Sequence, residues 1–431
     1  MKRLDALAAT VLAVVALAFA APGASAAPPA GACSSSDPAR PVVAERPWAQ
    51  QVLAPERVWP HSTGAGVLVA VVDSGVDADH PQLNAPGKVL PGRDFFLTGS
   101  LPGNYDCVSH GTSVASIIAG GPVDGVGFRG IAPGARILPV RVTDRPQSDS
   151  GEPTPIDPNT VAAGIRYAAD QGAKVINLSL SGNRDFPAIR DAIAYAQQRD
   201  ALIVAAVGNR QQETSSIPSY PAEHPGVLGV GSIDNTGART GASQIGPYVD
   251  LVAPGKSVLA AGRVGGHDYW DGTSFAAPFV SGAAALVRAA WPDLTAPQVA
   301  QRLMATADLA RGGRDSHEYG AGVVDPYRAV TEGLSGTPEA MPAVPTPQPD
   351  LAAEQEHRWW RQAGNAAVLA FGAVAVALVA VSTLTWLAAR GHRRRWRPTR
   401  TVIPPAVPAR EEPPEQMFLF PPPTSERPTQ R

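Results

Sequence analysis

Lysine is scarce in this chain of 431 residues. Only four lysines occur, so almost all of the 36 basic residues are arginines, and 38 acidic residues leave a formal net charge of −2. A chain without excess positive charge lacks the electrostatic signature of a nucleic-acid partner. Cysteine is scarcer still: Cys33 and Cys107 permit a single intramolecular disulfide, with two unpaired thiols as the alternative.

The first residues have the pattern of a secretory signal. Lys2 and Arg3 precede an apolar run over residues 6–21, and residues 24–26 (Ala-Ser-Ala) form a small-residue cleavage site. We therefore expect residues 1–26 to be a signal peptide. The alternative is an uncleaved anchor, but the run is short for a membrane span. Export to an oxidising compartment would allow the two cysteines to form a bridge.

A second apolar stretch covers residues 366–389 and contains no charged side chain. It is long enough for a transmembrane helix, with a buried helix of a soluble domain as the alternative. Trp360 and Trp386 lie near its ends, where aromatic rings favour the membrane interface, and an arginine cluster begins at Arg390. Because such clusters favour the cytoplasm, we expect a single-pass protein of the cell membrane, with residues 390–431 as its cytoplasmic tail and its main domain outside the cytoplasm.

The remaining chain divides into three parts by composition. Residues 27–46 are an irregular N-terminal extension rich in Ala, Pro and Ser, and residues 47–333 have a globular pattern. Residues 334–365 form a proline-rich linker, which we expect to be an extended stalk. Within the globular part, residues 144–158 are rich in Pro, Ser and Asp and predict a surface loop.

Apolar runs and helical patterns alternate along the globular part. Continuous apolar runs predict buried parallel strands at residues 67–72, 137–142, 175–180, 202–207, 227–230 and 248–252. Helical patterns lie between and after them, at residues 112–119, 160–171, 186–199, 274–290 and 296–307. The alternation predicts an α/β fold with a central parallel sheet and helices on both faces.

Two short strings contain a carboxylate and a histidine suited to nucleophilic catalysis. Such catalysis needs a base to take the proton of the nucleophile, a carboxylate to orient that base, and donors to stabilise the oxyanion. Asp73 directly follows the strand at residues 67–72. It therefore lies at the carboxyl end of a central strand, where α/β folds place their functional sites. His110 opens the string His-Gly-Thr-Ser-Val-Ala-Ser, which places it at the start of a buried helix. Taken singly, each could be an ordinary turn or core residue.

A third string supplies a nucleophile. Asp-Gly-Thr-Ser-Phe-Ala-Ala-Pro over residues 271–278 places Ser274 at the start of a helix, where backbone amides and the helix dipole favour developing negative charge. Asn209 follows the strand at residues 202–207, and its side-chain amide could donate to the same oxyanion. The alternatives are a helix-capping serine and a turn asparagine.

The strings around Asp73, His110 and Ser274 resemble the three signature motifs of the subtilisin family, peptidase family S8, in that family's chain order. The resemblance covers about residues 47–330, and Asn209 adds to the specificity of the three motifs. It implies a subtilisin-like fold and a serine endopeptidase with an Asp-His-Ser triad that acts on protein or peptide substrates.

A further segment resembles the substrate-binding strand of that family, which pairs with the backbone of the peptide. It consists of Ser179, Leu180, Ser181 and Gly182, and the family usually has glycine where Ser181 stands. Many subtilisins bind structural calcium, but we can assign no cluster of oxygen ligands in this sequence. We therefore expect neither a metal nor a cofactor.

The layout of the whole chain resembles the mycosins, the subtilisin-like proteases of actinobacterial type VII secretion systems. They share a signal peptide, a catalytic domain, a proline-rich stalk, one C-terminal span and a short tail. The resemblance implies a protease that clips exported proteins beside the membrane, in association with a type VII secretion membrane complex. It leaves open an alternative, in which the chain is mainly a structural component that stabilises that complex.

The two cysteines match a pair that in mycosins ties the N-terminal extension to the catalytic domain, so the resemblance implies a disulfide between Cys33 and Cys107. Secreted subtilisins generally carry a folded inhibitory pro-domain, whereas residues 27–46 are too few to fold alone. We expect this extension to stay attached as a structural strap.

Overall fold

The computed structural model describes residues 28–33, 35–97, 101–144, 156–212, 215–311, 313–314, 316–334 and 380–391. The chain divides into two units, residues 1–346 and residues 347–431. The predicted signal peptide lies outside the described residues, as do the linker beyond Leu334, residues 145–155 of the predicted loop and the tail beyond residue 391. Of the predicted span, residues 380–389 are described, within a helix at residues 380–391.

One helix among the described residues is long and apolar enough to cross a membrane, α6 at Thr273–Ala290. Within the domain 83% of it is buried, so it is a core helix of the first unit.

The first unit is built on a seven-stranded sheet with the order β2-β3-β1-β4-β5-β6-β7. All neighbouring strands pair in parallel. The strands are β1 (Leu68–Asp73), β2 (Arg93–Asp94), β3 (Arg136–Arg141), β4 (Val175–Leu178), β5 (Leu202–Ala206), β6 (Val227–Ile233) and β7 (Leu251–Pro254). The predicted parallel sheet is therefore confirmed.

The sixth predicted strand was placed too early, because β7 begins at Leu251 and not at residue 248. Val249 N donates to Gly246 O at 3.1 Å in a turn. The hydroxyl of Tyr248 donates to Ile245 O at 2.8 Å. The apolar residues before Leu251 are thus buried by a turn that packs on the sheet, and a local pattern cannot distinguish such a turn from a strand.

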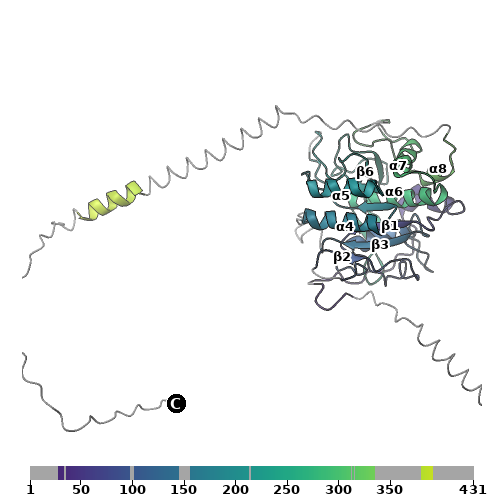
Figure 1. Cartoon of the computed structure of the whole chain (residues 1–431), viewed down its shortest axis with the longest axis horizontal. Helices are drawn as coiled ribbons and strands as arrows, with labels where there is room; N and C mark the ends of the chain where they lie inside the picture. The colour runs from purple at the N-terminus through teal and green to yellow at the C-terminus, as the bar shows by residue number, and fades with distance from the viewer. Residues whose placement is uncertain are drawn as a thin grey trace, which may run out of the picture. The chain divides into compact units, whose positions relative to one another are not determined.

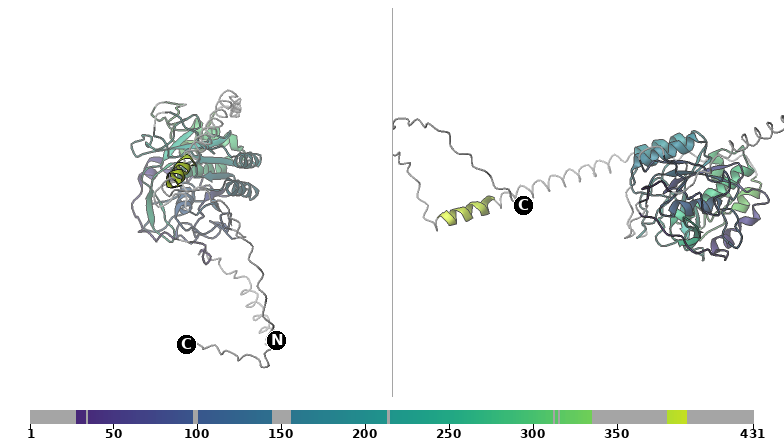
Figure 2. Two further views of the ribbon diagram at one scale, coloured as in Figure 1. Left: turned by 90° about the vertical axis from the view of Figure 1, so that its left-hand side faces the viewer. Right: turned by 90° about the horizontal axis from the view of Figure 1, so that it is seen from below.

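Helices cover both faces of the sheet (Figures 1 and 2). One face carries α4 (Pro158–Asp170) and α5 (Pro187–Gln197), and the other carries α3 (His110–Ala119), α6 and α7 (Ala296–Ala305). The alternation along β1 divides the core between them. Val69 and Val71 pack with α3 and α6, whereas Ala70 and Val72 pack with α4 and α5. Full burial of a valine contributes roughly 1.5–3 kcal/mol to stability.

Several elements were not predicted from the sequence. They are α2 (Trp48–Leu53), the 3₁₀ helix η1 (Pro55–Arg57), α8 (Pro326–Thr331), the two-residue strand β2, and an antiparallel hairpin of β8 (Val258–Ala261) and β9 (His267–Trp270). Each of them is short, so its residues show too few periods for a sequence pattern to stand out.

The N-terminal extension lies against the β8–β9 hairpin. Arg40 N donates to Gly265 O at 3.0 Å, and His267 N donates to Pro41 O at 2.9 Å. The side chain of Arg40 pairs with Asp268 at 3.1 Å. The extension is therefore held on the domain by backbone hydrogen bonds as well as by an ion pair.

Candidate active site

The first two predicted catalytic residues lie in direct contact. Asp73 is the last residue of β1 and His110 is the first residue of α3, and their side chains meet at 2.7 Å between Asp73 Oδ1 and His110 Nδ1. Both residues are buried. Burial alone would lower the pKa of His110, but the charge and the hydrogen bond of Asp73, together with the charge of Asp106, hold this pKa above its ordinary value.

Two glycines allow these elements to approach each other. Gly75 has φ +104°, and a Cβ at this position would lie 2.0 Å from the carbonyl oxygen of Tyr105. A Cβ at Gly111 would lie 2.0 Å from the carbonyl oxygen of Gly75. The start of α3 therefore packs directly on the turn after Asp73, and this close packing brings His110 to the carboxylate.

Ser274 is the second residue of α6, and Gly272 precedes the helix with φ +128°. This left-handed backbone favours glycine, and a Cβ here would lie 2.9 Å from the side-chain nitrogen of Asn209. The side-chain oxygen of Asn209 accepts from Thr273 N at 2.9 Å. Its amide nitrogen is therefore left on the side of Gly272, beside the N-terminus of α6.

The hydroxyl of Ser274 donates to the carbonyl oxygen of Ser179 at 3.2 Å, and the hydroxyl of Ser179 donates to the carbonyl oxygen of Ser274 at 2.6 Å. Among the described residues Ser274 makes no hydrogen bond to His110. The residue after Ser274 does reach the histidine, because the ring of Phe275 packs edge-on against the imidazole of His110 with centroids 5.0 Å apart. Apo active sites often have such loose hydrogen bonds, which tighten when substrate binds.

The predicted substrate-binding segment follows β4. Gly182 is already paired, because its N–H donates to Tyr220 O at 2.7 Å and Tyr220 N donates to Gly182 O at 2.9 Å. Ser181 is exposed, and its backbone N–H and C=O make no hydrogen bond within the described part of the chain. Of the four predicted residues, Ser181 therefore has backbone groups that are open to a partner.

The sequence profile described as Subtilase family, Peptidase_S8, matches residues 64–322, which is more than half of the chain. The chain belongs to the subtilase family. It is 37% identical to Mycosin-1 of Mycolicibacterium smegmatis over 346 residues, covering 69% of this chain and 76% of that protein. It is 36% identical to Thermitase of Thermoactinomyces vulgaris over 293 residues, covering 68% of this chain and 99% of that protein.

Solved structures agree with this assignment. The crystal structure of MycP1 from Mycobacterium smegmatis matches with a TM-score of 0.60 and 34% identity, covering 72% of this chain and 91% of that one. The MycP3 protease from the type VII (ESX-3) secretion system matches with a TM-score of 0.58 and 35% identity, covering 70% of this chain and 92% of that one. The predicted resemblance to subtilisins and mycosins is confirmed, and this subtilase is a serine endopeptidase.

Within the described part of this subtilase, no group of three or more His, Cys, Asp or Glu side chains is placed to hold a metal ion.

The sequence reasoning missed one buried carboxylate beside the site, that of Asp106, which is 1% exposed. Its position four residues before His110 was the available signal. This aspartate lies in the short segment that leads into the helix of the candidate residue His110, but its hydrogen-bond partners cannot be read from the sequence.

Proposed function

We propose that this subtilase hydrolyses peptide bonds with Asp73, His110 and Ser274 as its catalytic triad. The observation that carries the proposal is the buried 2.7 Å contact between Asp73 and His110. Asp73 holds the Nδ1–H of the imidazole, which leaves Nε2 to take the proton of the Ser274 hydroxyl as that oxygen attacks the scissile carbonyl. His110 then gives this proton to the leaving amine.

The oxyanion formed in this step needs donors. We propose Asn209 as one of them, because its side-chain nitrogen lies beside the N-terminus of α6, and the backbone N–H of Ser274 as the other. Both act together with the positive end of the helix dipole.

For the substrate, we propose an extended peptide that pairs with the chain after β4. The carbonyl oxygen of Ser179 would accept an N–H of the peptide once the Ser274 hydroxyl turns away from it. Ser181 would pair through its backbone groups, with Leu180 lining the site between them. Gly182 would support this strand from behind through its bonds to Tyr220, which leaves it without a free backbone group for the substrate.

For the setting, we propose a single-pass protein of the cell membrane, with the catalytic domain outside the cytoplasm, that cleaves exported proteins in association with a type VII secretion membrane complex. The support is the pair of hydrophobic segments in the sequence and the similarity to mycosins and to the MycP3 protease of such a system.

The experiment compares cells with the wild-type protein and cells with the Ser274→Ala variant, following both the processing of exported proteins and their total secretion. We expect processing to stop in the variant. Unchanged processing would overturn the proposed function. Secretion that continues in the variant but stops when the whole protein is deleted would identify the alternative, in which the chain is mainly a structural component that stabilises the complex.

A further inference from the structure

The carboxylate of Asp106 is fully engaged by hydrogen bonds. Its Oδ1 accepts from Ser74 Oγ at 3.0 Å and from Val108 N at 3.0 Å. Its Oδ2 accepts from Thr112 N at 2.9 Å and from Thr112 Oγ1 at 2.7 Å. Ser74 follows Asp73 and Thr112 lies two residues after His110, so one buried carboxylate bonds to the neighbours of both residues.

The start of α3 depends on these bonds. The first amides of a helix have no partner within it, and Ser109, the residue before α3, makes no side-chain capping bond. Gly111 N donates instead to Ser74 Oγ at 3.0 Å, and Thr112 N donates to Asp106. Asp106 and Ser74 therefore cap the helix from outside, and the negative charge lies at the positive end of the helix dipole.

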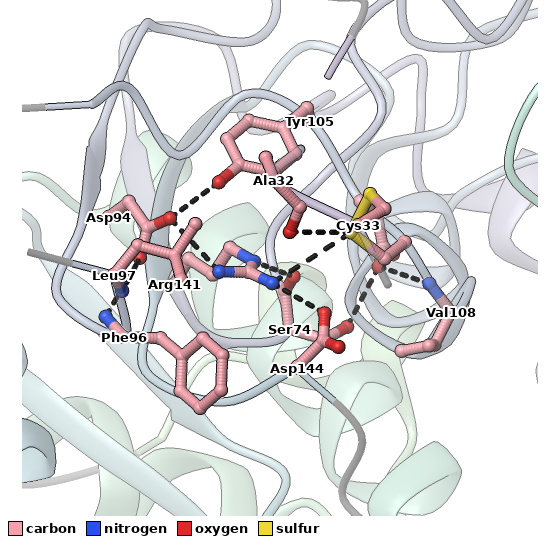
Figure 3. Close-up of polar contacts among 12 residues, drawn as sticks. Ala32, Cys33, Ser74, Asp94, Phe96, Leu97, Tyr105, Val108, Arg141 and Asp144 are labelled. Carbon is pink, nitrogen blue, oxygen red and sulfur yellow. Dashed lines mark hydrogen bonds and ion pairs between the residues drawn. A yellow bond between two sulfur atoms is a disulfide. The ribbon is translucent and has the colours of Figure 1, made fainter. Parts of the chain in front are cut away.

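Ser74 connects this cap to the catalytic carboxylate. Its N–H donates to Asp73 Oδ1 at 2.7 Å, the same oxygen that faces His110. Its carbonyl oxygen accepts from Arg141 Nε at 3.1 Å, as Figure 3 shows. The backbone and side chain of Ser74 are thus held on several sides, and the hydroxyl joins Asp106 to the helix that carries His110.

We propose that Asp106 is a positioning residue that sets the Asp73–His110 geometry, acting through Ser74 on Asp73 and through the first turn of α3 on His110. The inference rests on the proposed function, because it assumes that this pair does the chemistry. Asp106 itself is buried and all four of its hydrogen bonds are to the protein, so it does not act on the substrate directly. A displacement of about 1 Å in a catalytic group can lower the rate roughly a hundredfold.

The first variant is Asp106→Asn. Each carboxylate oxygen accepts hydrogen bonds from two donors. In either orientation of the asparagine amide, its nitrogen, which cannot accept, replaces one of these oxygens, so two hydrogen bonds are lost. We expect kcat for a peptide substrate to fall roughly ten- to a hundredfold with KM nearly unchanged, because binding groups are untouched.

The pH profile separates a positioning role from simple loss of stability. Removing the negative charge of Asp106 lowers the pKa of His110, so the acid limb of kcat/KM should move to lower pH. Three other charged groups lie at this place: Asp73, Arg141, whose Nε donates to Ser74 O at 3.1 Å, and, from the β8–β9 hairpin, Arg263, whose Nε donates to Asp106 O at 2.8 Å. All three remain in the variant, so they do not produce the shift of the acid limb.

Asp94→Asn is the matched control. Asp94 is also a buried carboxylate that accepts four hydrogen bonds: Oδ1 from the N–H groups of Phe96 and Leu97, and Oδ2 from Tyr105 and Arg141 (Figure 3). It bonds to no residue of the Asp73–His110 pair. We expect this variant to lose stability while its kcat and acid limb stay within about twofold of wild type at temperatures well below unfolding.

A second pair of variants covers the case in which Asp106→Asn does not fold. Ser74→Ala removes only the hydroxyl that joins Asp106 to Gly111. Ser62→Ala removes a buried hydroxyl with the same pattern, one bond donated to Leu286 O and one accepted from Gly64 N, away from the site. We expect kcat to fall about tenfold in the first and to stay unchanged in the second.

A kcat of Asp106→Asn within twofold of wild type, or an equal loss in Asp94→Asn, would overturn the inference. An unchanged kcat of Ser74→Ala would overturn it as well. The parallel measurement of Ser274→Ala distinguishes failure of the proposed function from failure of the proposed role of Asp106. If that variant stays active, the proposed function itself is wrong, whereas an inactive Ser274→Ala beside a fully active Asp106→Asn removes only the role of Asp106.

Discussion

Ser274 and Ser179 exchange hydrogen bonds across the site. The hydroxyl of Ser274 donates to the Ser179 carbonyl at 3.2 Å, and the hydroxyl of Ser179 donates to the Ser274 carbonyl at 2.6 Å. Asn177 Nδ2 donates to the Ser179 hydroxyl at 2.9 Å, so the end of β4 and the start of α6 are held together. The hydroxyl of the proposed nucleophile, Ser274, therefore occupies an acceptor that a bound peptide would also use. Under the proposed mechanism, peptide binding would displace this hydroxyl so that it can bond to His110.

The triad predicts a non-additive loss of activity. Ser274→Ala and His110→Ala should each lower kcat by about 10⁶-fold, and the double variant should be no worse than either, because triad residues act as a unit. Steady-state hydrolysis of a chromogenic peptide measures this. A double variant far below both single variants would show that the two side chains act in separate steps.

Asn209 should contribute to the oxyanion hole. Its replacement by Ala removes a donor that is aimed at charge in the transition state, so we expect kcat to fall by about 10²–10³-fold with a small change in KM. Asn84→Ala, an exposed asparagine before β2, serves as the control and should leave kcat unchanged. A change in KM alone would assign Asn209 to substrate binding.

The acid limb of kcat/KM should lie above pH 6.5, the ordinary pKa of histidine. Burial opposes the charged imidazole, but the contact with Asp73 and the charge of Asp106 outweigh it and raise this pKa. His110 must be neutral to act as the base, so activity falls as the pH falls through the raised pKa. A pH–rate profile tests the sign, and a limb below 6.5 would mean that burial dominates.

The disulfide between Cys33 and Cys107 spans 74 positions in the sequence (Figure 3). Closing a loop of this length should stabilise the folded protein by about 4 kcal/mol through the entropy of the unfolded chain. Urea unfolding with and without reductant measures the difference. Thiol labelling of the native protein checks the bridge first, since two alkylated cysteines would contradict it.

The same experiment extends to the N-terminal extension. Deleting residues 27–46 should lower stability more than it raises peptidase activity, because the deletion removes the bridge and the bonds of Arg40 and Pro41 to the β8–β9 hairpin. A large rise in activity on deletion would identify the extension as an inhibitor. Cys33→Ser in the full chain separates the effect of the bridge from that of the remaining contacts.

Membrane topology is a prediction from the sequence alone. A reporter fused after Arg397 should be found in the cytoplasm, and residues before Trp359 should be accessible to protease added outside. The uncharged run at residues 366–389 and the arginines after it are the reason. A reporter on the outside would contradict the single-pass topology.

The sequence by itself determined most of the parallel sheet and the identity of the candidate triad. The strands β1, β3, β4, β5 and β6 were found because continuous apolar runs are local features, and a strand buried on both faces needs such a run. Asp73, His110 and Ser274 could be proposed from the sequence because each lies in a short string with a glycine that permits a tight turn. Pairing of Cys33 with Cys107 was implied by resemblance, and the structure contains it.

Only the tertiary structure decided how these pieces meet. Gly182 pairs with Tyr220, and Ser179 exchanges hydrogen bonds with Ser274, so these contacts join segments that are distant in the chain. The four hydrogen bonds of Asp106 depend in addition on the direction in which its side chain points. No local pattern encodes such partners, because a buried polar group can be satisfied by any donor that folding brings near it. The sequence motifs identified the candidate chemical groups, and the packing of α3 and α6 on the sheet decided which of these groups are in contact.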